Sequence, residues 1–186
     1  MNMVKRRKQA GFVLAISMIF LIVMTMLAVT AIKKATMDEK VSGNLRAQNL
    51  AFDAAEKALR FCESNIELAA GDTEICKMKL GATVLVIPPT RPYRDDDVNA
   101  NFPIEWSNMD NWNERGPNNA VRLNGINAVP NVATQPQCMI ERWEIPSNRG
   151  EYPGDQFYPY VITARGIGST GTAVVWLQEV IRCGNY

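Results

Sequence analysis

The pattern of apolar and polar residues in the first third of the chain predicts one long helix with two different halves. From Phe12 to Ile32 the chain has 21 residues without a charge, and twelve of them are Leu, Ile, Val or Phe. At about 1.5 Å per residue, a helix of this length spans roughly 31 Å, which matches the hydrocarbon core of a bilayer. We therefore expect residues 12–32 to cross a membrane.

Beyond Lys33 the same helix is expected to continue as an amphipathic segment over residues 33–68. Mostly apolar side chains recur there at alternating spacings of four and three, which places them on one stripe of a helix. Gly43 is the weak point of this segment, because a Gly inside a helix costs about 1 kcal/mol relative to Ala. The stripe consists of Val41, Leu45, Gln48, Phe52, Ala55, Leu59, Cys62 and Ile66.

The remainder of the chain, residues 69–186, is expected to form one globular head. Residues 88–136 are rich in Asn, Pro, Asp and Gly, and they predict a loop-dominated insertion with one short helix around Glu105 to Asn111. A C-terminal sheet is expected over residues 138–183, built from three consecutive antiparallel strands. The β-like runs are residues 82–87, 138–145, 157–165 and 172–182.

These elements together predict an α+β fold. We expect the amphipathic half of the helix to pack on an antiparallel sheet of about three to four strands, because each element has an apolar side to bury. The 126 residues from Phe61 onward suffice for one modest core.

A cluster of basic residues precedes the apolar run and predicts its orientation. Lys5, Arg6, Arg7 and Lys8 stand in a row, and such residues hold the N-terminus in the cytoplasm. The segment after Lys33 then lies outside. A secretory signal cut after Ala31 is the alternative, but its apolar region is usually about 7 to 15 residues long.

Two stretches carry a resemblance to a known family. Residues 1–11, which end in Gly11 and are followed by Phe12 and the apolar run, resemble the class III leader of type IV prepilins. Residues 39–60 resemble the N-terminal region of PilX-type minor pilins, and residues 160–178 resemble that family's last hairpin more weakly. The resemblance implies a pilin-like ladle, cleavage by a prepilin peptidase between Gly11 and Phe12, and methylation of the new amine of Phe12.

One position departs from most pilins. Their fifth mature residue is a Glu that is thought to neutralise the N-terminal amine of a neighbouring subunit, and here that position is Ile16. PilX-type pilins and the tip-capping pseudopilin of type II secretion resemble this chain in lacking the Glu. A carboxylate in hydrocarbon is costly and usually functional. We hypothesise a place at or near the pilus tip; the alternative is that Ile16 only improves the membrane anchor.

The resemblance implies a minor pilin that helps to initiate type IV pilus assembly and supports twitching motility and adhesion. The protein would first sit in the inner membrane with a periplasmic head and then enter the extracellular pilus. Its partners would be other minor pilins and the major pilin, through the N-terminal helix, and a PilY-type tip adhesin. Two alternatives remain, a single-span extracytoplasmic binding or sensory protein and a tip pseudopilin of a type II secretion system.

The four cysteines, Cys62, Cys76, Cys138 and Cys183, all follow the apolar segment. Outside the cytoplasm they are free to form disulfides. Of the three possible connectivities we favour Cys62–Cys76 with Cys138–Cys183, and free thiols are the alternative. The chain has no His and no Cys-x-x-Cys pair, so we expect no zinc site.

Charge and residue types argue against two function classes. The leader carries four of the 20 Lys and Arg, so the mature chain has 16 basic and 19 acidic residues and a net charge of −3. No basic stripe is present, so nucleic-acid binding is not expected. Without His there is no Ser-His or Cys-His pair, and we expect neither catalysis nor a cofactor. The remaining acid–base candidates are Asp96, Asp97, Glu141 and Glu144, and nothing distinguishes them from surface acids.

Three further patterns have competing interpretations. Residues 166–171 match a dinucleotide fingerprint, but a β-like run follows them, so we interpret their glycines as hairpin residues. Residues 95–101 space oxygens as a calcium loop does, but they lack its Gly and Glu, which favours a solvated loop. Trp143 and Trp176 are expected in the core, whereas Trp106 and Trp112 are candidates for a binding surface.

Overall fold

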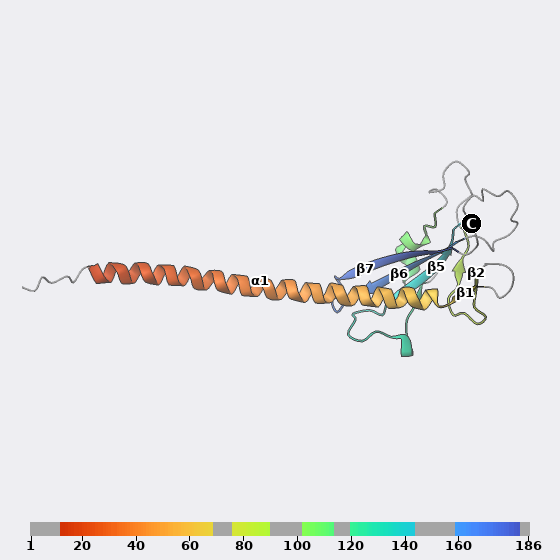
Figure 1. Ribbon diagram of the computed structural model, residues 1–186, viewed down its shortest axis with the longest axis horizontal. Helices are drawn as coiled ribbons and strands as arrows, with labels where there is room; N and C mark the ends of the chain where they lie inside the picture. The colour runs from red at the N-terminus through yellow and green to blue at the C-terminus, as the bar shows by residue number, and fades with distance from the viewer. Residues whose placement is uncertain (1–11, 69–75, 90–101, 114–119, 144–158, 183–186) are drawn as a thin grey trace, which may run out of the picture. The chain divides into compact units, whose positions relative to one another are not determined.

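The computed structural model describes residues 12–68, 76–89, 102–113, 120–143 and 159–182 (Figure 1). The chain divides into two compact units, residues 1–45 and 46–186. Helix α1, Phe12–Glu63, begins in the first unit and ends in the second. Gly43 does not interrupt it, and a Cβ at Gly43 would meet nothing within 4 Å.

The first unit, as far as it is described, consists of α1 alone. Its apolar side chains between Phe12 and Ile32 are exposed, and α1 is long and apolar enough to cross a membrane. The hydroxyl groups of Ser17, Thr25 and Thr30 each donate to the carbonyl oxygen three residues earlier, at 2.8 Å. The three polar side chains are thus satisfied within the helix, as hydrocarbon requires.

Helix α1 ends five residues earlier than the predicted boundary at residue 68. The side-chain amide of Asn65 donates to the carbonyl oxygen of Phe61 at 2.7 Å and satisfies one of the last carbonyls of the helix. Strand β1, Ile66–Leu68, follows and pairs antiparallel with β2, Cys76–Met78. The expectation that Ile66 lies on the helical stripe was therefore wrong.

A five-stranded sheet forms the centre of the second unit. Its order is β3-β5-β6-β7, and β4 also pairs with β5. The three long strands are consecutive and antiparallel, as predicted. The sheet is nevertheless mixed, because β3 pairs with β5 in parallel. The strands are β3 Val86–Ile87, β4 Val121–Arg122, β5 Gln137–Arg142, β6 Tyr160–Ile167 and β7 Val174–Ile181.

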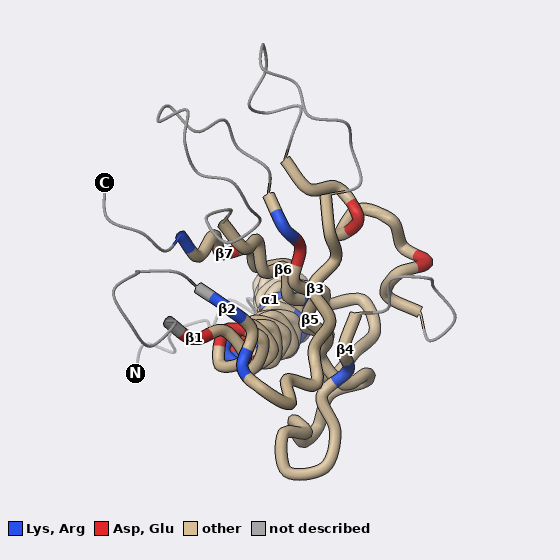
Figure 2. The backbone as a smooth tube through the Cα atoms, turned by 90° about the vertical axis from the view of Figure 1, so that its right-hand side faces the viewer, with Lys and Arg blue, Asp and Glu red and all other residues tan. Residues whose placement is uncertain are grey.

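Both faces of this sheet are covered, which the sequence had not indicated. The part of α1 in the second unit packs on one face, and Figure 2 views it along the helix axis beside the strands. The described residues of the insertion include three short 3-10 helices: η2 Glu105–Ser107, η3 Met109–Trp112 and η4 Gly125–Asn127. A second apolar cluster covers the opposite face with Trp112 from η3 and Met139 from β5.

Candidate functional site

The helix–sheet seam of the second unit is built from small residues on both sides. The buried residues of α1 there are mostly alanines, and Ala47 and Ala51 pack against Ala173 of the β6–β7 turn. A Cβ at Gly166 would overlap the carbonyl oxygen of Ala51, and a Cβ at Gly168 would overlap that of Ala47. The backbones of helix and sheet therefore touch directly, which only glycine on the strand side permits.

This seam corrects the predicted helical stripe. Ala55, Leu59 and Cys62 are buried as expected, but Val41 and Leu45 are exposed and Phe52 is 46% exposed. The face that meets the sheet is displaced toward the alanines, because large side chains would hold the two backbones apart. Alanine spacing at residues 47, 51 and 55 was the signal in the sequence, and a search for large apolar residues misses it.

The glycine-rich stretch 166–171 contributes to the helix–sheet seam and to the connection between β6 and β7. Gly166 lies in β6 at the seam, and residues 168–173 form the connection to β7, as the hairpin interpretation predicted. The amide of Gly168 donates to the carbonyl oxygen of Ala173 at 2.8 Å and closes this connection.

One disulfide joins α1 to the sheet and corrects the favoured connectivity. Cys62 pairs with Cys138 on β5, with the two Cα atoms 6.2 Å apart and both residues fully buried. Cys62 therefore does not pair with Cys76, nor Cys138 with Cys183. The expected pairing joined cysteines that follow one another along the chain, whereas packing brings the last turn of α1 onto the start of β5. Cys183 and the side chain of Cys76 lie outside the described residues.

The second apolar cluster corrects the expectation for Trp112. Trp112 is buried and makes an edge-to-face contact with Trp176 of β7, with ring centroids 4.7 Å apart. Its indole N–H donates to the carbonyl oxygen of Trp106 at 2.7 Å, and the indole of Trp106 donates to Pro103. Trp112 is therefore core and not a binding surface, and Trp106 is half-buried against the same cluster.

Glu141 lies on this covered face of β5 and is only 2% exposed. Its Oε1 atom accepts a hydrogen bond of 2.8 Å from the backbone N–H of Glu105, at the start of η2. Burial raises the pKa of the Glu141 carboxyl from 4.5 to about 7, although hydrogen bonds from the backbone of Glu105 and Trp106 act in the opposite direction. Glu141 is thus a buried anchor for η2 and not the surface acid that we expected.

The other residues singled out in the sequence fall into two groups. Phe12 is the first residue of α1, and Ile16 lies one turn later with its side chain exposed. In the described part of the chain, no group of three or more His, Cys, Asp or Glu residues is placed to hold a metal ion. Gly11, the acidic stretch 95–101 with Asp96 and Asp97, and Glu144 lie outside the described residues.

Comparisons with known proteins identify the family. A family model described as PilX N-terminal matches residues 10–60, and one described as type IV pilus assembly protein PilX C-term matches residues 70–183. No curated protein and no solved structure matches the chain. The two matched segments contain most of α1 and the whole sheet. The chain therefore belongs to the PilX family of type IV pilus assembly proteins, as a PilX-type minor pilin.

Proposed function

We propose that this pilus component helps to initiate type IV pilus assembly from a position at or near the fibre tip. Residues 12–32 hold it in the inner membrane, with the N-terminus in the cytoplasm, until the assembly machinery extracts it. A prepilin peptidase first cuts between Gly11 and Phe12, and the new amine of Phe12 is methylated. The apolar part of α1 then packs against the helices of other minor pilins and of the major pilin.

The observation that carries the tip position is the residue at position 16. Ile16 stands on the first turns of a helix whose first 21 residues include no charge. A subunit with a carboxylate at that depth neutralises the N-terminal amine of the neighbouring subunit above it in the fibre, because an unpaired charge in hydrocarbon is costly. A subunit with Ile16 offers no such contact. It therefore fits the start of a fibre, because the first subunit has no subunit above it whose amine needs a carboxylate partner.

Twitching motility and adhesion follow from this position, because a fibre that is not initiated can neither retract nor attach. Partners at the tip are other minor pilins and a large adhesin of the PilY type. A tip pseudopilin of a type II secretion system shares the missing acid, and a deletion strain separates the two. Loss of pili with normal secretion supports the pilus assignment.

The test of the tip position restores the missing acid. In electron micrographs of immunogold-labelled pili, the wild-type protein is expected at one end of each fibre. Ile16→Glu should spread the label along the shaft and raise the gold count per fibre several-fold. Ile19→Glu places the same charge three residues away, where it meets no amine, and should only reduce the amount of protein in pili. An unchanged label distribution in Ile16→Glu fibres contradicts the proposal.

A further inference from the structure

The two edges of the five-stranded sheet are built differently. At one edge, β5 is flanked by β3 and β4, which are two residues long each. At the other edge lies β7, with eight residues that all pair in register with β6. Among the described residues, β7 has no strand on its outer side. A row of backbone N–H and C=O groups therefore lines that side.

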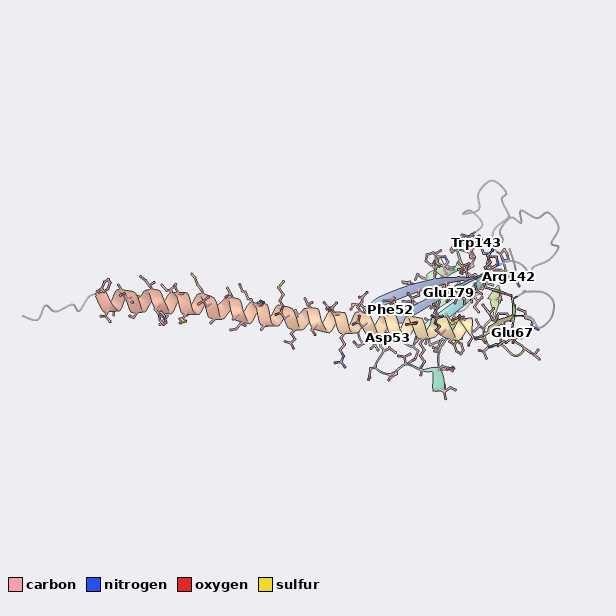
Figure 3. The ribbon with its side chains drawn as sticks, in the orientation of Figure 1. Phe52, Asp53, Glu67, Arg142, Trp143 and Glu179 are labelled. Atoms are coloured by element: carbon pink, nitrogen blue, oxygen red, sulfur yellow. A yellow bond between two sulfur atoms is a disulfide. The ribbon has the colours of Figure 1, made fainter. Side chains whose placement is uncertain are left out.

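Sheet edges of this length are usually protected against pairing with another chain. The common devices are a very short strand, a lysine or other charged residue, a proline, a bulge, or a covering helix or loop. Strand β7 is neither short nor bulged and has no lysine or proline, since its sequence is Val-Val-Trp-Leu-Gln-Glu-Val-Ile and its register with β6 is uninterrupted. Its single charged residue is Glu179, which is labelled in Figure 3. Glu179 alternates onto the face that carries α1, within electrostatic reach of Arg60.

The side chains of β7 are already held by their own sheet. Leu177 and Ile181 pack toward α1, and Trp176 packs on Trp112 at the opposite face. On that opposite face the amide of Gln178 donates to the hydroxyl of Thr163 at 2.9 Å. The backbone of β7 is thus preorganised as an extended strand, and Val180 remains 45% exposed beside it.

We propose that the outer edge of β7 docks an extended segment of a second, different polypeptide, which joins the sheet as an additional strand. Only the backbone of an extended chain matches alternating N–H and C=O groups along eight residues. Specificity then comes from alternate side chains, and the segment should place apolar or β-branched residues beside Val180. This inference rests on the proposed function, since it describes a partner within the pilus assembly.

The direction of α1 argues for a different polypeptide rather than a second copy. Ala47 and Ala51 lie near Ala173 at the start of β7, whereas Ala58 and Cys62 share a cluster with Leu177 and Ile181 near its end. Helix and strand therefore run in the same direction. Antiparallel pairing of two β7 strands, the more stable mode, would make the two helices run in opposite directions. Helices that leave one membrane together run the same way.

The test uses the full-length protein in piliated native cells. A genetically encoded benzophenone amino acid is placed at Gln178 or at Val180, which are two residues apart on one face of β7. We expect ultraviolet light to join both variants to the same second protein. Mapped by mass spectrometry, the joined residue should shift by two positions when the probe moves from 178 to 180. The control probe at Ile126, which is 98% exposed and lies in η4, should not join this segment.

Three outcomes overturn the proposal: no intermolecular product from either β7 position, products only with this chain or a second copy of it, or products whose position does not shift by two. Piliation is scored in the same strains. If piliation is normal and any of these outcomes is observed, the proposed docking site is rejected and the proposed function stands. The docking site is supported and the proposed function is contradicted if the crosslinked residue shifts by two positions but deletion of this gene leaves piliation normal.

Discussion

Gly166 on β6 lies directly against the carbonyl oxygen of Ala51 on α1, with no room for a side chain between them. A Cβ at Gly166 would also lie 2.5 Å from the backbone nitrogen of Ala55 and 2.9 Å from its Cβ. The carbonyl oxygen of Ala51 and the nitrogen of Ala55 belong to the helix backbone and cannot move aside as a flexible side chain does. The contact therefore fixes the distance between α1 and the sheet in the second unit.

Gly166→Ala should destabilise the protein by about 3 kcal/mol, because the added methyl group overlaps backbone atoms and forces helix and strand apart. The measurement is the free energy of unfolding in denaturant for the full-length protein in detergent micelles. Gly171→Ala is the matched control, since a Cβ there meets nothing within 4 Å, and it should change stability by less than about 0.5 kcal/mol. Equal effects of the two substitutions would show that the close seam does not exist.

The disulfide pairing is open to direct mapping. Proteolysis without reduction should release one peptide pair that joins Cys62 to Cys138. Within the chain this leaves Cys76 and Cys183 to each other, so a second pair that joins them is expected in the oxidised protein. A peptide that joins Cys62 to Cys76 would contradict the arrangement of α1 on β5.

Removal of the mapped bond should cost stability. The bond spans a sequence separation of 76 residues, and the chain-entropy relation gives about 4 kcal/mol for a loop of that size. The double variant Cys62→Ala with Cys138→Ala should lose roughly this amount in denaturant unfolding. Reducing agent also opens the expected Cys76–Cys183 bond, so it should destabilise the wild-type protein by more than the double substitution does, and it should destabilise the double variant further. Unchanged stability of the double variant would mean that the bond does not constrain the unfolded chain.

Stability should fall as the pH rises from about 4.5 to about 7, because of Glu141. Burial raises the pKa of this carboxyl in the folded protein to about 7, so within this window the folded state binds more protons than the unfolded state. Each pKa unit corresponds to 1.36 kcal/mol, so the loss across the window is about 3 kcal/mol. It is complete above pH 7.

Glu141→Gln removes the titrating carboxyl and keeps an acceptor for the N–H of Glu105, so this contribution to the slope should vanish. Glu67→Gln, at a half-buried site on β1 with a 3.9 Å ion pair to Lys77, is the control and should preserve the slope. Denaturant unfolding at a series of pH values measures both. A Glu141→Gln variant with the wild-type slope would assign the pH dependence to other groups.

The sequence predicted those features that depend on a repeating pattern. The uncharged run after Phe12 indicated the long helix, and the β-like runs located β5, β6 and β7. The short connection of residues 168–173 joins β6 to β7, and β5 pairs with β6 continuously over six residues. Strands that follow one another along the chain commonly pair, and this arrangement was the one expected.

Features that depend on contacts between distant segments were missed. The alanine face of α1 is apparent only when Gly166 and Gly168 are known to face it. The pairing of Cys62 with Cys138 depends on where the helix crosses the sheet, and spacing along the chain does not encode that position. The parallel pairing of β3 with β5 and the burial of Trp112 likewise follow from how the insertion folds back over the sheet.

The central claim is that the protein is a processed pilin whose apolar helix begins at Phe12, and the intact mass of the protein from native pili or membranes tests it most directly. We expect a mass that corresponds to residues 12–186 with one added methyl group on the N-terminal amine and two fewer hydrogen atoms for each disulfide. A protein that still begins at Met1, or one that begins at Ile32 after signal-peptide cleavage, would contradict the account.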